Sequence, residues 1–266
     1  MTDPQDAPYP SASFRDRTVI VTGAAGDIGR VYVRAFAAAG AGVIAMDLPQ
    51  ATASGRAVTA QASAAGPGRA EFVPGDVTSD EDWDNAVHMA MRRFGRLDVL
   101  VNNAAIYRGI AAKRPLTELT TGDWDQVMAV NVRGSWQGIK ACTPALAASG
   151  AGRVVNVSSV VARAGVPGFA HYVAAKAAVE GLTRAAAREL GPRNICVNAV
   201  APGLVDNSAT RTMNDEGYLS AAVAGRALAR KLSPADLVGA VFWLASPTAG
   251  CVTGQTVIVD GGQVFA

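Results

Sequence analysis

Histidine and cysteine are scarce in this chain of 266 residues, which has two histidines and three cysteines. The cysteines, Cys142, Cys196 and Cys251, lie far apart in the sequence and share no metal-ligand spacing. They are also too few for a disulfide framework. We therefore expect no metal site, and we expect free thiols of the kind found in a reducing compartment.

Long apolar runs and clusters of charge are missing too. No run of about 18 apolar residues occurs, so no membrane span is predicted. The net charge is +2 and the longest basic clusters are pairs, Arg92-Arg93 and Arg230-Lys231, so we expect no nucleic-acid partner. The opening segment MTDPQDAPYPSAS has prolines and acidic residues but no apolar core of a signal peptide. This predicts a flexible N-terminal arm over residues 1–16 and a cytoplasmic protein.

From residue 17 onward, short apolar runs alternate with helical stretches. Most of the runs are bounded by Gly, Pro, Asp or Asn, and unbroken apolar strands are typical of a parallel sheet covered on both faces. The candidate strands are Thr18–Val21, Gly42–Met46, Glu71–Pro74, Leu97–Val101, Arg153–Val157, Cys196–Val200 and Thr256–Val259. No linker or repeat interrupts the alternation. We predict one α/β domain over residues 17–266, a doubly wound Rossmann-type parallel sheet of about seven strands.

A glycine-rich turn, GAAGDIG, follows the first candidate strand and leads into a helix. Such a turn lets backbone N–H groups approach a pyrophosphate at a helix N-terminus, although many similar turns are simple connectors. The strand–turn–helix context favours the dinucleotide site. We therefore expect Gly23, Asp27, Ile28 and Gly29 to contact a cofactor.

Asp47 ends the second candidate strand. A carboxylate there accepts hydrogen bonds from ribose hydroxyls and repels a 2′-phosphate, although an Asp can also simply cap a strand end. Its neighbour Leu48 and the turn residues Ala24 and Ala25 offer no cation for that phosphate. The sequence therefore favours NAD over NADP as the cofactor, with Asp47 and Leu48 beside the adenosine ribose.

Polar residues also end the third and fourth candidate strands. Asp76-Val77 follows the third, and Asn103-Ala104 follows the fourth. Ligands of open α/β sheets bind at the carboxyl ends of the strands. Each of these residues alone is equally consistent with a turn, but together they indicate the same cofactor crevice.

Tyr172 and Lys176 lie four residues apart, and Ser159 precedes the tyrosine by thirteen residues. Residues i and i+4 share one face of a helix, so the lysine ammonium is expected beside the phenol. A neighbouring cation favours the phenolate and suits the phenol to proton transfer near neutral pH. His171, next to the tyrosine, is interpreted as a surface or packing residue.

These motifs together resemble the short-chain dehydrogenase/reductase family. The resemblance rests on TGAAGDIG from Thr22, Asp76-Val77, NNAA from Asn102, Asn131 in VMAVNVRG, VNVSS ending at Ser159, YVAAK from Tyr172 to Lys176, and APG at Ala201–Gly203. These elements occur in family order and at family spacing, and the resemblance covers nearly all of the chain from Arg17 to Gly262.

The resemblance implies a catalytic tetrad of Asn131, Ser159, Tyr172 and Lys176. In it the tyrosine is the general acid or base, the lysine also contacts the nicotinamide ribose, the serine donates to the substrate oxygen, and the asparagine holds a water that relays protons towards the lysine. The thirteen-residue offset selects Ser159 over Ser158. The resemblance also places Pro202, Gly203 and Val205 at the nicotinamide, and it implies a homotetramer.

One residue of the glycine-rich turn departs from the family pattern. Asp27 stands where the family usually has glycine, and we expect its carboxylate to turn outward and cap the first helix with help from Arg30. Residues 204–230 are predicted to be a substrate flap, because Asp206–Ser220 follows a strand end and lacks clear periodicity.

The leading hypothesis is an NAD-dependent oxidoreductase that acts on a secondary alcohol or the matching ketone. A small set of apolar residues is predicted to line its substrate pocket: Ile106, Tyr107, Val160, Val161, Val166, Phe169 and Tyr218. Two alternatives remain. One is an NADPH-dependent 3-oxoacyl-[acyl-carrier-protein] reductase, and the other is a non-catalytic dinucleotide sensor.

Overall fold

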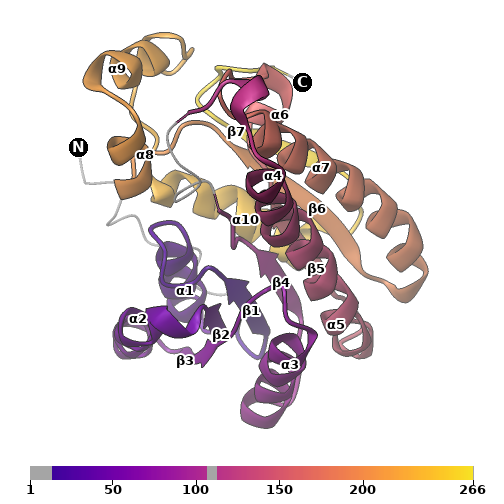
Figure 1. Cartoon of the computed structure of the whole chain (residues 1–266). Helices are drawn as coiled ribbons and strands as arrows, with labels where there is room; N and C mark the ends of the chain where they lie inside the picture. Colours follow the sequence, from indigo (N-terminus) through magenta and orange to yellow (C-terminus); the bar gives the residue numbers. More distant parts are fainter. Residues whose placement is uncertain (1–13, 107–112, 266) are drawn as a thin grey trace.

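The computed structural model describes residues 14–106 and 113–265. Its centre is a parallel sheet of seven strands in the order β3-β2-β1-β4-β5-β6-β7 (Figure 1). The strands are β1 Thr18–Thr22, β2 Gly42–Asp47, β3 Arg69–Pro74, β4 Val99–Asn102, β5 Arg153–Val157, β6 Cys196–Pro202 and β7 Thr256–Val259. The predicted doubly wound sheet is confirmed. The strand order changes direction between β1 and β4, and a crevice opens at such a point.

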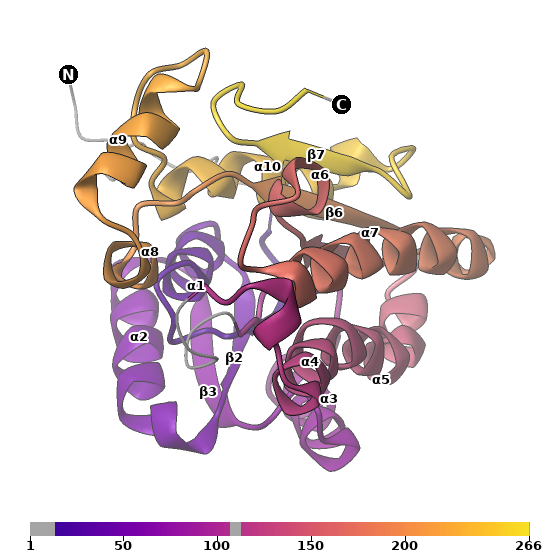
Figure 2. The same cartoon turned by 45° about the horizontal axis from the view of Figure 1, so that its top comes forward.

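Helices cover both faces of the sheet (Figures 1 and 2). They are α1 Gly29–Ala38, α2 Thr52–Ala65, α3 Asp80–Phe94, α4 Thr121–Met128, α5 Gly134–Ala148, α6 Val161–Ala164, α7 Ala170–Leu190, α8 Ser208–Met213, α9 Glu216–Ala224 and α10 Val238–Ala245. Helices α1, α2 and α10 pack into one apolar core, and α3, α5 and α7 pack into the other. No helix of the described residues is long and apolar enough to span a bilayer.

Strand alternation divides the apolar side chains between these two cores. On β1, Val19 and Val21 belong to the core under α1, whereas Ile20 belongs to the opposite core together with its strand partners Ile44 and Leu100. Both sets are buried. The unbroken apolar runs of the sequence therefore reflect burial on two faces.

The packed fold begins earlier than predicted. Residues 1–13 of the predicted arm lie outside the described part of the chain, but Phe14 is fully buried. Its ring centroid lies 4.8 Å from that of Phe36 and 4.9 Å from that of Phe242. The predicted arm over residues 1–16 therefore does not include Phe14. The sequence obscured this because the phenylalanine follows a segment rich in proline and polar residues.

We expect Phe14→Ala to lower the free energy of unfolding by about 3 kcal/mol, because it removes a buried aromatic ring between two others. Denaturant unfolding measures the change. Phe265→Ala is the matched control, since that side chain is 80% exposed and should change stability little. Equal, small effects of the two substitutions would show that the Phe14 contact contributes nothing.

Local residues mark the ends of two helices. Helix α7 ends at Leu190, directly before Gly191, and Ser233 forms a capping box with Asp236. The predicted flap region consists of α8 and α9, whose N-caps are Asn207 and Asp215. Helix α8 lies beside the start of α1 in the two views, and α9 lies farther out (Figures 1 and 2). The flap is therefore locally helical, although its sequence showed no clear period.

Candidate active site

A cavity of about 510 Å³ lies at the carboxyl ends of the central strands. The glycine-rich turn, the ends of β2, β5 and β6, α7 and the flap all contribute to its wall. The predicted site residues that line it are Gly23, Asp27, Ile28, Gly29, Asp47, Asn103, Ala104, Ser159, Tyr172, Lys176, Pro202, Gly203 and Val205. Leu48, Asp76, Val77 and Asn131 are not among its lining residues.

The turn between β1 and α1 is tightly closed. Gly23 has φ +62°, and a Cβ on Gly29 would lie 2.0 Å from the carbonyl oxygen of Gly23. Only glycine fits at Gly29 without a shift of the backbone. Helix α1 begins after the N-cap Ile28, which forms no side-chain capping hydrogen bond. The N-terminal N–H groups of this helix border the cavity, where they suit an anionic ligand.

Asp27 does not cap this helix, which corrects part of the prediction. Its Oδ1 accepts a hydrogen bond from Arg30 Nη2 at 2.6 Å, so the expected help from Arg30 is present. Its Oδ2 instead accepts hydrogen bonds from the backbone nitrogen of Ser208, at 2.9 Å, and from the Ser208 hydroxyl. The carboxylate thus reaches from the turn to the flap.

Asp47 also binds the turn. Its Oδ2 accepts a hydrogen bond from the backbone nitrogen of Ala25 at 2.8 Å, and its Oδ1 accepts one from that of Leu48, also at 2.8 Å. The carboxylate therefore lies at the end of β2 with a fixed orientation towards the cavity wall. Leu48 itself is on the exposed side, with 36% of its surface accessible.

Asn103 holds the end of β4 against the end of β1. Its Nδ2 donates to the carbonyl oxygens of Thr22, at 2.8 Å, and Gly23, at 3.3 Å. The backbone nitrogen of Ala104 donates to Thr22 Oγ1 at 2.9 Å. These contacts form the floor of the crevice at the point where the strand order changes direction.

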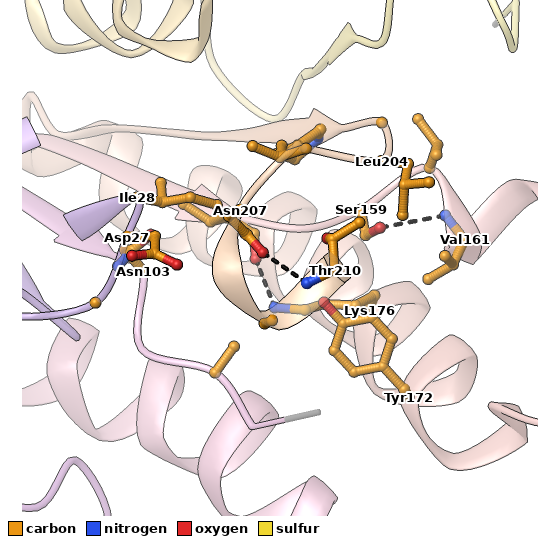
Figure 3. Close-up of a pocket in the computed structure, with 18 of the residues that line it drawn as sticks. Asp27, Ile28, Asn103, Ser159, Val161, Tyr172, Lys176, Leu204, Asn207 and Thr210 are labelled. Carbon is orange, nitrogen blue, oxygen red and sulfur yellow. Dashed lines mark hydrogen bonds between the residues drawn. The ribbon is translucent and has the colours of Figure 1, made fainter. Parts of the chain in front are cut away.

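Lys176 is buried inside the cavity wall, with 2% of its surface accessible. Its Nζ donates to the carbonyl oxygen of Val157 at 2.8 Å and lies 5.5 Å from the centre of the Tyr172 ring. Burial lowers the pKa of the Lys176 ammonium from its ordinary value to about 7. Figure 3 shows the tyrosine hydroxyl and the lysine nitrogen on the same side of the cavity, with Ser159 nearby.

The two adjacent serines have different surroundings. Ser158 is buried, and its hydroxyl contacts the carbonyl oxygen of Lys176 at 3.1 Å and the Glu180 carboxylate at 3.2 Å. Ser159 is half-buried, and its Oγ accepts a hydrogen bond from the backbone nitrogen of Val161 at 3.4 Å. Ser158 therefore connects β5 to α7, while the Ser159 hydroxyl lies beside the start of α6 (Figure 3).

Asn131 lies in a π-helical turn, Ala129–Arg133, between α4 and α5. Its Nδ2 donates to the carbonyl oxygens of Ile106, at 3.1 Å, and Val127, at 3.0 Å. Its Oδ1 is buried and has no hydrogen-bond partner within residues 14–106 and 113–265. Such turns are frequent at functional sites, but the asparagine is one layer behind the cavity wall.

The other predicted residues outside the cavity wall have structural contacts. Asp76 Oδ1 accepts hydrogen bonds from the backbone nitrogen and the hydroxyl of Thr78, each at 2.8 Å, and Val77 is buried in the apolar core. His171 is also buried, which supports packing over a surface role. Their positions indicate that they shape the crevice from behind.

The substrate end of the cavity contains five of the predicted apolar residues, Val160, Val161, Val166, Phe169 and Tyr218. Ile106 is not part of the lining, and Tyr107 lies outside the described residues. The sequence reasoning missed Gln263, which lines the cavity from the segment after β7. No local pattern marks this residue, because β7 places it there from the far end of the chain.

Fold and site together define a dinucleotide-dependent oxidoreductase. A family model described as enoyl-(acyl carrier protein) reductase matches residues 23–263. The chain is 38% identical to the short-chain reductase protein NovJ of Streptomyces niveus, over 99% of this chain and 100% of that protein. It is 37% identical to a 3-oxoacyl-[acyl-carrier-protein] reductase of Synechocystis, over 94% and 97% of the two chains. It is 35% identical to a cyclopentanol dehydrogenase of Comamonas testosteroni, over 93% and 96%.

Solved structures agree. A short-chain dehydrogenase/reductase from Brucella melitensis has a TM-score of 0.87 at 32% identity, covering 96% of this chain and 100% of that one. A candidate NAD(P)-dependent gluconate 5-dehydrogenase from Beutenbergia cavernae, with NADP bound at low occupancy, has a TM-score of 0.86 at 36% identity, covering 97% and 99%. The chain belongs to the short-chain dehydrogenase/reductase family. It is thus an oxidoreductase that acts on CH–OH groups of small molecules with a nicotinamide cofactor.

Proposed function

We propose that this protein is an NAD-dependent oxidoreductase that interconverts an uncharged, largely apolar secondary alcohol and the matching ketone. One observation carries the proposal. The buried Lys176 nitrogen and the Tyr172 ring lie within a single cavity with the glycine-rich turn and the Asp47 carboxylate. That arrangement brings a proton-transfer group next to a dinucleotide site.

In this proposal Tyr172 accepts the hydroxyl proton during oxidation and donates it during reduction. Lys176 stabilises the phenolate, and Ser159 donates to the substrate oxygen as negative charge builds on it. A bound nicotinamide supplies the hydride acceptor in oxidation and the hydride donor in reduction. Asn131, with its buried Oδ1, is assigned to a water that returns protons from the region of Lys176.

The preference for NAD rests on Asp47. Its carboxylate faces the turn and carries a full negative charge, which repels a 2′-phosphate and suits ribose hydroxyls. Arg30 is the arginine that lines this end of the cavity, and it is ion-paired with Asp27 at 2.6 Å. We therefore assign the adenosine end of the cavity to NAD.

The lining of the cavity supports an uncharged substrate. Among the described residues the charged lining side chains are Asp27, Arg30, Asp47 and Lys176, and three of these belong to the cofactor end. The opposite end contributes valine, phenylalanine, methionine and tyrosine side chains. A carboxylate or phosphate on the substrate would lose its hydration there. Lys113, a described cation at this end, lies against the Tyr218 ring and is not a lining residue of the cavity.

The alternative is a 3-oxoacyl-[acyl-carrier-protein] reductase that uses NADPH, because a relative with that name shares 37% identity with this chain. Docking an acidic carrier protein requires free basic residues at the cavity mouth. Arg163 is ion-paired with Glu180 at 3.3 Å. A cytoplasmic homotetramer stays a prediction for either function.

The test is an activity screen with NAD and with NADP over cyclic and aryl alcohols, sugars, steroid alcohols and 3-oxoacyl thioesters. We expect turnover of apolar secondary alcohols with a higher kcat/KM for NAD. A strong preference for NADPH together with turnover of 3-oxoacyl thioesters would replace the proposal with the alternative.

The role of Asp47 can be measured in the same assay. Asp47→Asn keeps the size of the side chain but removes its charge, so we expect the ratio of kcat/KM for NAD over NADP to fall by roughly 10-fold or more. Asp76→Asn is the matched control, because that carboxylate lies outside the cavity lining. An unchanged ratio in Asp47→Asn would remove the basis for the NAD assignment.

A further inference from the structure

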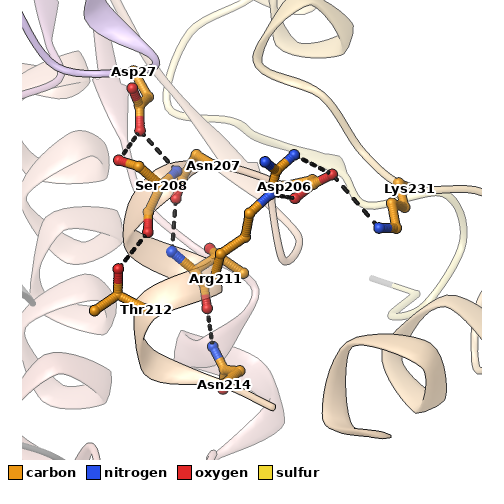
Figure 4. A network of polar contacts seen from close by, with 9 residues as sticks. Asp27, Asp206, Asn207, Ser208, Arg211, Thr212, Asn214 and Lys231 are labelled. Atoms are coloured by element: carbon orange, nitrogen blue, oxygen red, sulfur yellow. Dashed lines mark hydrogen bonds and ion pairs between the residues drawn. The ribbon is translucent and has the colours of Figure 1, made fainter. Parts of the chain in front are cut away.

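The flap is held to the cofactor turn by a contact between residues 181 positions apart in the sequence. Figure 4 shows the Asp27 carboxylate directed at the first residue of α8. It accepts from both the backbone nitrogen and the hydroxyl of Ser208. Two donors on one carboxylate oxygen form a charge-assisted pair, which is stronger than a neutral hydrogen bond.

The other contacts drawn around α8 stay close to the flap. Asp206 binds Arg211 at 2.7 Å and Lys231 at 3.9 Å, and Ser208 accepts through its carbonyl oxygen from the Thr212 hydroxyl at 2.8 Å. These contacts shape the flap but leave its distance from α1 unfixed. The Asp27–Ser208 contact, in contrast, joins two walls of the cavity (Figure 4).

The turn end of this contact is rigid. Arg30 holds the second oxygen of the Asp27 carboxylate at 2.6 Å, and Arg30 Nε also donates to the carbonyl oxygen of Gly26 at 3.3 Å. The carboxylate is therefore drawn away from the N–H groups of the turn and towards the flap. An anionic ligand can therefore bind near this carboxylate, because its charge is balanced by Arg30 and it accepts hydrogen bonds from Ser208.

The far end of the flap is held in another way. On α9, the ring of Tyr218 lies 3.9 Å below the ammonium nitrogen of Lys113, and the same nitrogen is 5.9 Å from the centre of the Phe169 ring. Both rings line the substrate end of the cavity. The flap thus has one side-chain contact over each half of the cavity, in addition to the backbone hydrogen bonds that Ala227 and Leu228 donate to Gly262 and Gly261 at its base.

We propose that Asp27 and Ser208 form a tether that keeps α8 over the bound dinucleotide and sets the rate at which the cofactor leaves. The tether positions α8 and takes no part in hydride or proton transfer. This inference rests on the proposed function, because it needs a dinucleotide in the cavity. Loss of the tether frees the cofactor end of the flap, while the Lys113 contact keeps the substrate end in place.

The test measures the dissociation rate of NADH by stopped-flow fluorescence. We expect Ser208→Ala and Asp27→Ala each to raise this rate about 3- to 10-fold, the range for one charge-assisted contact at a partly exposed site. The double variant should be no faster than Asp27→Ala, because Asp27→Ala already removes both hydrogen bonds to Ser208, including the hydroxyl bond that Ser208→Ala removes. Ser220→Ala is the matched control, since this exposed serine lies on the same flap, in α9.

A dissociation rate within twofold of the wild type in both Asp27→Ala and Ser208→Ala, or additive effects in the double variant, would overturn the tether. Steady-state kinetics adds a second readout. We expect KM for NAD to change while KM for the alcohol does not, and the reverse for Lys113→Gln, which weakens the contact at the other end of the flap.

Hydrogen exchange in the cofactor-free protein separates this inference from the proposed function. The tether is present without cofactor, so the α8 amides should exchange faster in Ser208→Ala than in the wild type. If the α8 amides exchange faster in Ser208→Ala but the protein binds no NADH, the Asp27–Ser208 contact is supported and the proposed function is contradicted. If exchange is unchanged and the protein binds NADH, only the tether is contradicted.

Discussion

Turnover falls by about 10²- to 10⁴-fold in Tyr172→Phe, the range over which a positioned general acid or base contributes to a rate. The substitution removes one oxygen from a half-buried ring and leaves the ring itself beside Phe169, at a centroid distance of 6.5 Å. The cavity keeps its shape, so the loss should appear in kcat and in kcat/KM alike. NADH affinity should change little.

The measurement is the NAD-linked rate over a panel of secondary alcohols, with NADH binding followed by fluorescence titration. Tyr218→Phe is the matched control. It removes a hydroxyl from another tyrosine of the same cavity, and its ring keeps the contact with Lys113. A Tyr172→Phe enzyme that retains more than about a tenth of the wild-type rate would contradict general acid–base catalysis by this residue.

Much of the fold could be predicted from the sequence, because the sheet depends on local patterns. Most strands contain an apolar run of a few residues, and strands β1 and β5 are fully buried along their length. A strand buried on both faces is mainly apolar, so its pattern is visible without long-range information, although β5 also buries Arg153 and Asn156. The same reasoning located the glycine-rich turn, whose Gly29 has no room for a side chain.

The features that the sequence could not reveal depend on contacts between distant segments. The expectation that Asp27 caps α1 relied on neighbours in the chain, whereas the carboxylate binds Ser208 from the flap. Phe14 belongs to the core only because Phe36 and Phe242 meet there. The offset in the sequence selected Ser159, but it could not reveal that the Ser158 hydroxyl donates to the buried Glu180 carboxylate.

Replacing Lys176 by methionine separates the chemical role of the lysine from its effect on stability. We expect the NAD-linked rate to fall by about 10²- to 10³-fold, because the variant loses the charge that stabilises the phenolate. Methionine nearly matches the volume of the lysine and fits the buried position. Lys140→Met is the matched control, since the Lys140 side chain is 56% exposed.

The same variant should change how stability depends on pH. Burial lowers the pKa of Lys176 to about 7 from its ordinary value of 10.5, so between these two pH values the unfolded chain binds more protons than the folded one. The free energy of unfolding therefore rises with pH across this window in the wild type, by an amount on the order of a few kcal/mol. Lys176→Met lacks this rise, whereas Lys140→Met keeps it.

Denaturant unfolding of the cofactor-free proteins at several pH values between 7 and 10 measures the difference. Parallel curves for the wild type and Lys176→Met would contradict the burial of a titrating lysine.

The same burial explains the catalytic role of the lysine. Protonation of the buried Lys176 amine is unfavourable when Tyr172 is neutral, and it becomes favourable when Tyr172 is a phenolate. The ammonium and the phenolate therefore stabilise each other. Burial of the lysine is therefore what makes its charge respond to the proton on the tyrosine.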